Sequence, residues 1–144
     1  MTEGILALVG AIVGAVIGIL GTYIGAIKIQ RKNWFQVAGK ELRQAFLPEL
    51  IALDPSSQKA IDPFEILRSA FKKHQGTVNE FEFFLPIEKR KDFREAWRAY
   101  YQSENGPNHP FLEQYSCHLG DVKKAQETRT LAMERIGRIL EFTE

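Results

Sequence analysis

The chain has 144 residues, a hydrophobic content of 44% and a formal net charge of +1. That length suits one domain of ordinary size, but the hydrophobic residues are unevenly spread. The sequence contains no nucleophile elbow, phosphate-binding glycine loop, dinucleotide-binding fingerprint or zinc-protease motif. We therefore expect no enzymatic activity and no cofactor.

The N-terminal segment carries no charged residue from residue 4 to residue 27, a stretch of 24. A helix of this length reaches roughly 36 Å, enough to cross a hydrocarbon core of about 30 Å. The leader holds an acidic residue and no basic one, and the apolar stretch is longer than that of a signal peptide, so we expect an uncleaved anchor. The excess of basic residues after the span places the C-terminal part in the cytoplasm and the N-terminus outside, at Lys28, Arg31 and Lys32.

Five glycines fall on one side of this predicted helix. At about 100° per residue they lie within an arc of about 80°, and they are Gly10, Gly14, Gly18, Gly21 and Gly25. A stripe of small residues lets membrane helices approach closely, so we expect a helix-packing face and a homo-oligomer. Glycine is also simply frequent in membrane helices. A pore is a weaker inference, because only Thr22 offers a polar group near the stripe.

Residues 33–144 hold 16 Lys/Arg and 17 Asp/Glu. The spacing of their apolar residues is helical throughout. A first helix is predicted over 34–54, in which Pro48 either kinks or restarts the helix. Asp62 and Pro63 indicate the N-cap and first turn of a second helix, and Gly76 is expected to interrupt it.

Residues 77–85 are ambiguous, because their phenylalanines alternate as in a strand and also recur as in a helix. The capping pattern of Thr77 and Glu80 favours a helix. Pro86 opens the next helix, whose apolar stripe has ideal helical spacing and consists of Phe93, Ala96, Trp97, Tyr100 and Tyr101.

Residues 104–110 are expected to form a loop and residues 111–120 a short helix. Asp121 is predicted to cap a final helix whose apolar side carries Val122, Ala125, Ala132, Ile136, Ile139 and Leu140. The predicted fold is all-α: a single N-terminal transmembrane helix in an anchor at 1–32, followed by a small cytosolic helical bundle at 33–144.

Between Arg68 and Arg98, eight Lys or Arg residues stand against five Asp or Glu, beside a tryptophan and two tyrosines. Such a surface suits phosphates with stackable bases or an anionic lipid leaflet. The alternative is a solvated helix face with i, i+4 ion pairs. The candidate ligand-binding residues are Lys72, Lys73, His74, Lys89, Arg90, Lys91, Arg94, Arg98 and His109.

The three histidines lack the spacing of metal ligands, and no cysteine pair accompanies them, so no metal site is expected. Cys117 is the only cysteine and cannot form an internal disulfide. A single cysteine agrees with a reducing location, and its neighbour His118 does not by adjacency make a catalytic pair.

The stretches "AFLPEL", "KHQGTVNEFEFFL" and "DFREAWRAYY" resemble an uncharacterised group of small bacterial single-pass membrane proteins. In layout the chain is also similar to the type III CRISPR ancillary effector that couples an N-terminal membrane segment to a soluble domain binding cyclic tetra-adenylate. This similarity transfers no binding residue position by position.

The layout implies an oligomeric sensor-effector of the inner (cytoplasmic) membrane in bacterial antiviral defence. Its cytosolic domain would bind a cyclic oligoadenylate and act through the membrane segment. The alternative is a structural or adaptor anchor that recruits a protein partner. No duplex nucleic acid is expected as a partner in either role.

Overall fold

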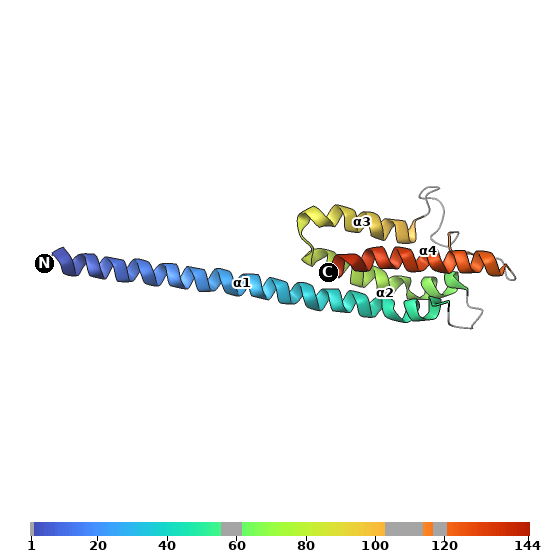
Figure 1. Cartoon of the computed structure of the whole chain (residues 1–144), viewed down its shortest axis with the longest axis horizontal. Coiled ribbons are helices and arrows are strands. Elements are labelled where there is room, and N and C mark those ends of the chain that lie inside the picture. Colours follow the sequence, from blue (N-terminus) through green and yellow to red (C-terminus); the bar gives the residue numbers. More distant parts are fainter. Residues whose placement is uncertain (1, 56–61, 103–113, 117–120) are drawn as a thin grey trace. The chain divides into compact units, whose positions relative to one another are not determined.

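The computed structural model describes residues 2–55, 62–102, 114–116 and 121–144, with the side chains of all of these except 2–17 and 19–21. The described residues form four α-helices and no strand (Figure 1), which confirms the prediction of an all-α fold. The elements are α1 (Thr2–Leu53), α2 (Pro63–Phe84), α3 (Ile87–Tyr101), α4 (Val122–Leu140) and a 3₁₀ turn, η1 (Glu141–Thr143).

The chain divides into two units, Met1–Trp34 and Phe35–Glu144. The first unit is the N-terminal part of α1, where large apolar side chains are exposed at Tyr23, Ile24 and Ile29. Among the residues that the structure describes, no helix is long and apolar enough to cross a membrane. The structure does not describe most side chains of the predicted span at 4–27. The transmembrane helix therefore stays a prediction.

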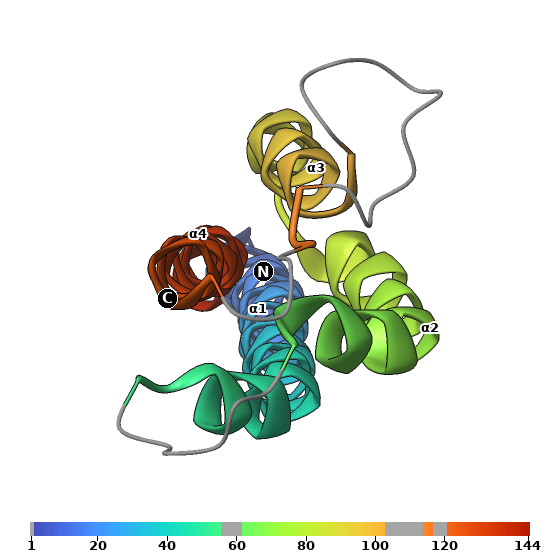
Figure 2. The ribbon, with the colours of Figure 1, turned by 90° about the vertical axis from the view of Figure 1, so that its right-hand side faces the viewer.

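The second unit is an up-and-down bundle. Residues 35–53 of α1 and the helices α2, α3 and α4 each run antiparallel to the preceding one (Figure 1), and Figure 2 shows them in cross-section. Each helix buries side chains that recur every three or four residues, as expected of amphipathic helices. The core includes Leu42, Phe46, Leu67, Val78, Phe81, Phe93, Trp97, Tyr100, Ala132, Ile136 and Ile139.

Aromatic rings close one end of this bundle. The Phe81 ring of α2 lies 5.5 Å from that of Phe35 and 5.4 Å from that of Phe93. The Phe93 ring lies 5.3 Å from that of Phe142 in η1. Such pairs contribute about 0.5–1.5 kcal/mol beyond the burial of their area. We call this the proximal end, defined by these four rings, because it contains the first residue of the second unit.

Both predicted N-caps are confirmed. An Asp62 side-chain oxygen accepts a hydrogen bond from the backbone N–H of Phe64 at 3.0 Å. Asp121 accepts one from the backbone N–H of Lys124 at 3.0 Å. Each bond satisfies a backbone donor that has no partner within the first turn of its helix.

The prediction that Gly76 interrupts the second helix is wrong, because α2 continues through it to Phe84. A glycine inside a helix costs about 1 kcal/mol relative to alanine. Val78 and Phe81 follow it on the same helix and are buried. Burying each such side chain stabilises by about 1.5–3 kcal/mol, which outweighs the cost of the glycine.

The stretch at 77–85 is therefore helical as far as α2 extends, although Thr77 is not its cap. The Thr77 hydroxyl donates to the backbone carbonyl of Lys73 at 2.9 Å, one turn back in the same helix. Pro48 likewise lies inside a helix, and α1 runs past it to Leu53 without a restart.

Val122, predicted on the apolar side of the last helix, is 81% exposed. It is the first residue of α4, so no earlier turn of that helix covers its side chain. Of the predicted short helix at 111–120, only 114–116 are described, and they form a turn. The predicted loop at 104–110 lies outside the described residues.

Two helical glycines provide a matched test of this packing. A Cβ added at Gly39 would lie 3.3 Å from Thr143 Cβ, whereas one at Gly76 would meet nothing within 4 Å. We expect Gly39→Leu to lower the free energy of unfolding by about 1–3 kcal/mol through overpacking. Gly76→Leu should raise it by about 0.5–1 kcal/mol, because leucine is the better helix former. Denaturant unfolding of the full-length variants measures both, and equal effects would contradict this packing.

Candidate functional site

His74 is the buried ionisable side chain around which three helices meet. It lies seven residues after Leu67 and seven before Phe81, on the apolar face of α2, and has no exposed surface. Its ring stacks on that of Phe46 in α1, with centroids 3.9 Å apart. A polar group in such a place needs hydrogen-bond partners, because leaving it without them costs about 1–3 kcal/mol.

Both ring nitrogens of His74 have partners, from different helices. Nδ1 lies 2.9 Å from the hydroxyl of Tyr100 in α3. Nε2 lies 3.1 Å from a carboxylate oxygen of Glu49 and 3.2 Å from the backbone carbonyl of Ala45, both in α1. We call Ala45, Glu49, His74 and Tyr100 the His74 cluster.

The partners assign the protons of this cluster. A carbonyl and a carboxylate can only accept, so Nε2 carries the hydrogen and donates to Ala45 and Glu49. Nδ1 then accepts from the Tyr100 hydroxyl. Burial raises the pKa of Tyr100 well above its usual range, so the phenol keeps its proton. The neutral imidazole with hydrogen on Nε2 satisfies every one of these contacts.

Burial and charge act in opposite directions on His74. Burial lowers its pKa, because a charged imidazolium loses its hydration there. The hydrogen bond and charge of Glu49 raise its pKa, and Lys73 lowers it slightly. The effect of burial is the larger, so the pKa lies below 6.5 and the ring is neutral at pH 7.

A second layer of polar contacts surrounds Tyr100. Its backbone carbonyl is in the last turn of α3, where carbonyls have no partner within the helix. It accepts from the Tyr115 hydroxyl and from the Gln114 side-chain amide, both at 2.8 Å. Arg135 of α4 donates to the Gln114 amide oxygen, and burial raises the pKa of Tyr115 to about 12. These side chains close the C-terminal end of α3.

The His74 cluster is almost wholly buried and joins three helices. The Glu49 side chain is only 12% exposed. Within the described ranges, every buried side-chain nitrogen and oxygen has a hydrogen-bond partner, and no group of three potential metal ligands is found. The cluster is thus a structural connection between α1, α2 and α3.

Two of the predicted ligand-binding arginines have structural partners. Arg90 donates from Nε to the carbonyl of Leu85 and from Nη2 to that of Phe83, both at 3.0 Å, and so caps the C-terminal end of α2. Arg94 donates to one carboxylate oxygen of Glu82 from Nε at 2.7 Å and from Nη2 at 2.5 Å. Both contacts fasten α3 to the end of α2.

The other predicted cations are exposed, but the structure does not bring them to one place. Lys72 and Lys73 precede Phe83 by about ten residues of α2, roughly 15 Å along the helix. Lys89 instead follows the turn at Leu85 and Pro86 that joins α2 to α3, which we call the α2–α3 turn. A row along α3 has the spacing i, i+3, i+7 and consists of Lys91, Arg94 and Arg98. His109 lies outside the described residues, as do Cys117 and His118.

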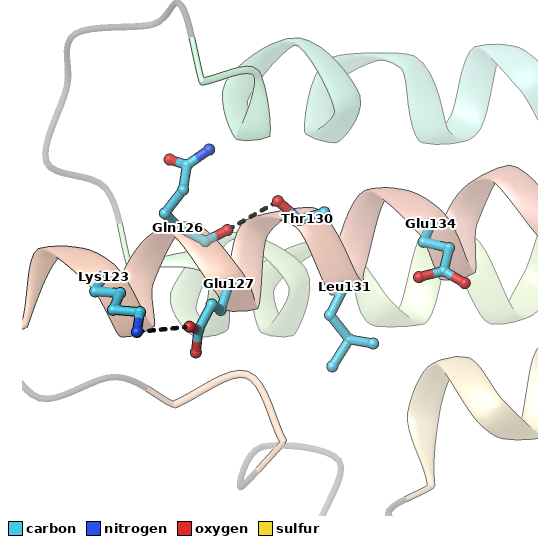
Figure 3. Close-up of a pocket in the computed structure, with 6 residues that line it drawn as sticks. All are labelled: Lys123, Gln126, Glu127, Thr130, Leu131 and Glu134. Atoms are coloured by element: carbon cyan, nitrogen blue, oxygen red, sulfur yellow. Dashed lines mark hydrogen bonds and ion pairs between the residues drawn. The ribbon is translucent and has the colours of Figure 1, made fainter.

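A hollow of about 530 Å³ is lined by α4 (Figure 3), by Lys123, Gln126, Glu127, Thr130, Leu131 and Glu134. The Lys123 ammonium lies 4.0 Å from a Glu127 carboxylate oxygen. Of the predicted ligand-binding residues that the structure describes, none lines this hollow. With two carboxylates against one amine, its charge does not suit an anionic ligand.

No protein family, curated protein or solved structure matches this chain. The resemblance to small single-pass membrane proteins therefore stays a prediction.

Sequence reasoning missed Glu49, Gln114, Tyr115 and Arg135 as polar partners in the core. It also placed His74 on a surface. The signal that could have corrected this was spacing, because His74 continues the buried series of Leu67 and Ala70, and that series runs on past Gly76. Glu49 gave no such signal, since its role depends on which helix packs beside α1.

The His74 cluster predicts acid sensitivity. A histidine whose pKa is lowered by folding stabilises the folded state above pH 6.5, and that stability is lost as the pH falls below 6.5. We expect the free energy of unfolding to decrease there by up to about 1.4 kcal/mol per pH unit, the limit for one proton. His74→Gln keeps a donor and an acceptor but cannot titrate, so its dependence on pH should be shallower.

Denaturant unfolding of the full-length protein between pH 5 and 8 measures this dependence. His109→Gln and His118→Gln, made in parallel, measure how much of the slope comes from the other histidines. A His74→Gln variant with the slope of the wild type would contradict the assignment of the neutral ring.

Proposed function

We propose that the chain is a self-associating membrane anchor that holds its helical bundle at the cytoplasmic face of the inner membrane. The observation that carries the proposal is the uncharged stretch at 4–27, which belongs to one long helix, α1. The exposure of Tyr23, Ile24 and Ile29 supports it, because an apolar helix surface favours a lipid environment.

Features of the described part of this segment suit the inside of a membrane. The Thr22 hydroxyl donates to the carbonyl of Gly18 at 2.8 Å, so this polar side chain is satisfied within its own helix. A Cβ at Gly18 or Gly25 would meet nothing within 4 Å. These two positions are free to accept the backbone of a second copy. In this role the bundle would recruit a protein partner, and Leu47 and Ile51 offer it exposed apolar side chains one turn apart.

We expect Gly18→Leu with Gly25→Leu to increase the monomeric fraction, because leucine side chains keep the two backbones apart. Photobleaching counts of labelled full-length protein in lipid nanodiscs measure this fraction. The control is Ile19→Leu with Ile27→Leu, which keeps the hydrophobicity and falls on the side of the helix opposite the glycines at about 100° per residue. Unchanged oligomers in the glycine variant would contradict the packing face.

A second candidate function is binding of a nucleotide second messenger of the cyclic oligoadenylate class, as in membrane effectors of antiviral defence. The specific observation in its favour is the exposed row of Lys91, Arg94 and Arg98 on α3. Arg90 and Arg94 are poor choices for testing it, since both make contacts that hold the fold.

Arg98→Glu is the better test. We expect it to weaken binding of cyclic tetra-adenylate at least tenfold, and the affinity of the wild type to fall as salt increases. Titration calorimetry with the full-length protein measures both, and Lys123→Glu on α4 is the control for charge alone. No binding at micromolar concentrations would reject this candidate and leave the anchor unaffected.

A further inference from the structure

One side of α1 stays open to solvent within the second unit, among the residues that the structure describes. Its large apolar side chains are Val37, Leu47 and Ile51, which are 56%, 52% and 63% exposed. Lys40 and Gln44 lie between them and are exposed as well. At about 100° per residue these five positions fall within an arc of about 80°, on the side of the helix opposite its buried residues. The bundle thus leaves an apolar face of this helix uncovered.

The spacing of this face is that of a coiled coil. Its five positions follow one another at intervals of three, four, three and four residues, which is the a and d pattern of a heptad repeat. The a positions hold Val37, Gln44 and Ile51, and the d positions hold Lys40 and Leu47. Branched residues at a with leucine at d favour a pair of helices, and a polar residue at a fixes their register. We call these five residues the α1 seam.

The α1 seam is complementary to itself when two copies of the helix run parallel and in register. Val37, Leu47 and Ile51 then each meet the same residue of the other copy, and the two Gln44 amides can donate to one another. Antiparallel helices that keep their a and d positions together would set Ile51 against Lys40 or Asn33. That arrangement buries an apolar side chain against a polar one, so the parallel pair is favoured.

The charges beside the α1 seam also pair across parallel copies. Lys40 at a d position packs next to the e position of the other helix, which holds Glu41, and both side chains are exposed. Two ammonium groups therefore meet two carboxylates, which offsets the repulsion between the two lysines. The other charged residues of α1 at 35–53 are Arg43 and Glu49, and both have partners within the bundle.

We propose that two copies of the chain pair along the α1 seam as parallel helices in register. The seam covers little more than two heptads, and so short a coiled coil is marginal between free molecules. The anchor makes it sufficient, because it confines the copies to one membrane and raises their effective concentration. The inference rests in this respect on the proposed function, and it names a second copy as the partner that Leu47 and Ile51 contact.

A disulfide at position 51 tests the pairing. The full-length Cys117→Ser, Ile51→Cys protein is reconstituted in phosphatidylcholine vesicles, oxidised and separated on a non-reducing gel. Two cysteines form a disulfide only when their Cα atoms lie within about 7 Å, as those of facing a positions do in a parallel pair. We expect a covalent dimer. Val122→Cys in the same background places a cysteine at an exposed apolar position of α4 and should give none.

A charge exchange tests the contact between Lys40 and Glu41. Lys40→Glu in the Ile51→Cys protein brings four carboxylates together and should lower the yield of the dimer by about tenfold. Adding Glu41→Lys restores opposite charges across the pair and should restore the yield. Both side chains are exposed, so the bundle itself should keep its stability. Lys123→Glu on α4 is the control for charge alone and should leave the yield unchanged.

Extraction with alkaline carbonate separates the failure of this inference from that of the proposed function. A protein that resists extraction but forms no disulfide at position 51 overturns the pairing and leaves the anchor intact. A protein that is extracted overturns both.

Two further results would overturn the proposal. Equal yields from Ile51→Cys and Val122→Cys would mean that the disulfides form by random collision. A disulfide between copies with Val37→Cys and copies with Leu47→Cys, without one at position 51, would indicate antiparallel helices.

Discussion

A histidine without contact to solvent must find a partner for each ring nitrogen, and in this chain that requirement sets how three helices pack. His74 can satisfy Nε2 only where α1 presents the Ala45 carbonyl and the Glu49 carboxylate, and Nδ1 only where α3 presents the Tyr100 hydroxyl. Any shift of one helix by a turn would break one of these bonds. The apolar core supplies most of the stability, and these bonds favour one register of the helices.

Much of the helical bundle could be predicted from the sequence. Apolar spacing and the caps at Asp62 and Asp121 act within a few residues, so they are readable locally. The break expected at Gly76 failed because burial further along α2 outweighs the local preference of a glycine. The polar partners of the core were not predictable, since Glu49 and His74 are 25 residues apart and meet only through tertiary packing.

The basic residues that looked like one surface separate into groups once their contacts are known. Arg90 and Arg94 fasten one helix to the next, while Lys72 and Lys73 lie well away from the α2–α3 turn. Sequence alone could not make this division, because a guanidinium that caps carbonyls and one that binds phosphate look the same along the chain. Both kinds of guanidinium carry the same charge, and only the position of the group that accepts its hydrogen bonds shows which role an arginine has.

Arg90 also has a consequence for how the chain folds. Its two bonds span five and seven residues, and the Arg94–Glu82 pair spans twelve. Contacts this local close small loops and form fast, whereas those between α1 and η1 span a hundred residues. The α2–α3 hairpin can therefore assemble early and offer a template for the rest. During synthesis it emerges before α4, so the last helix adds to a surface that already exists.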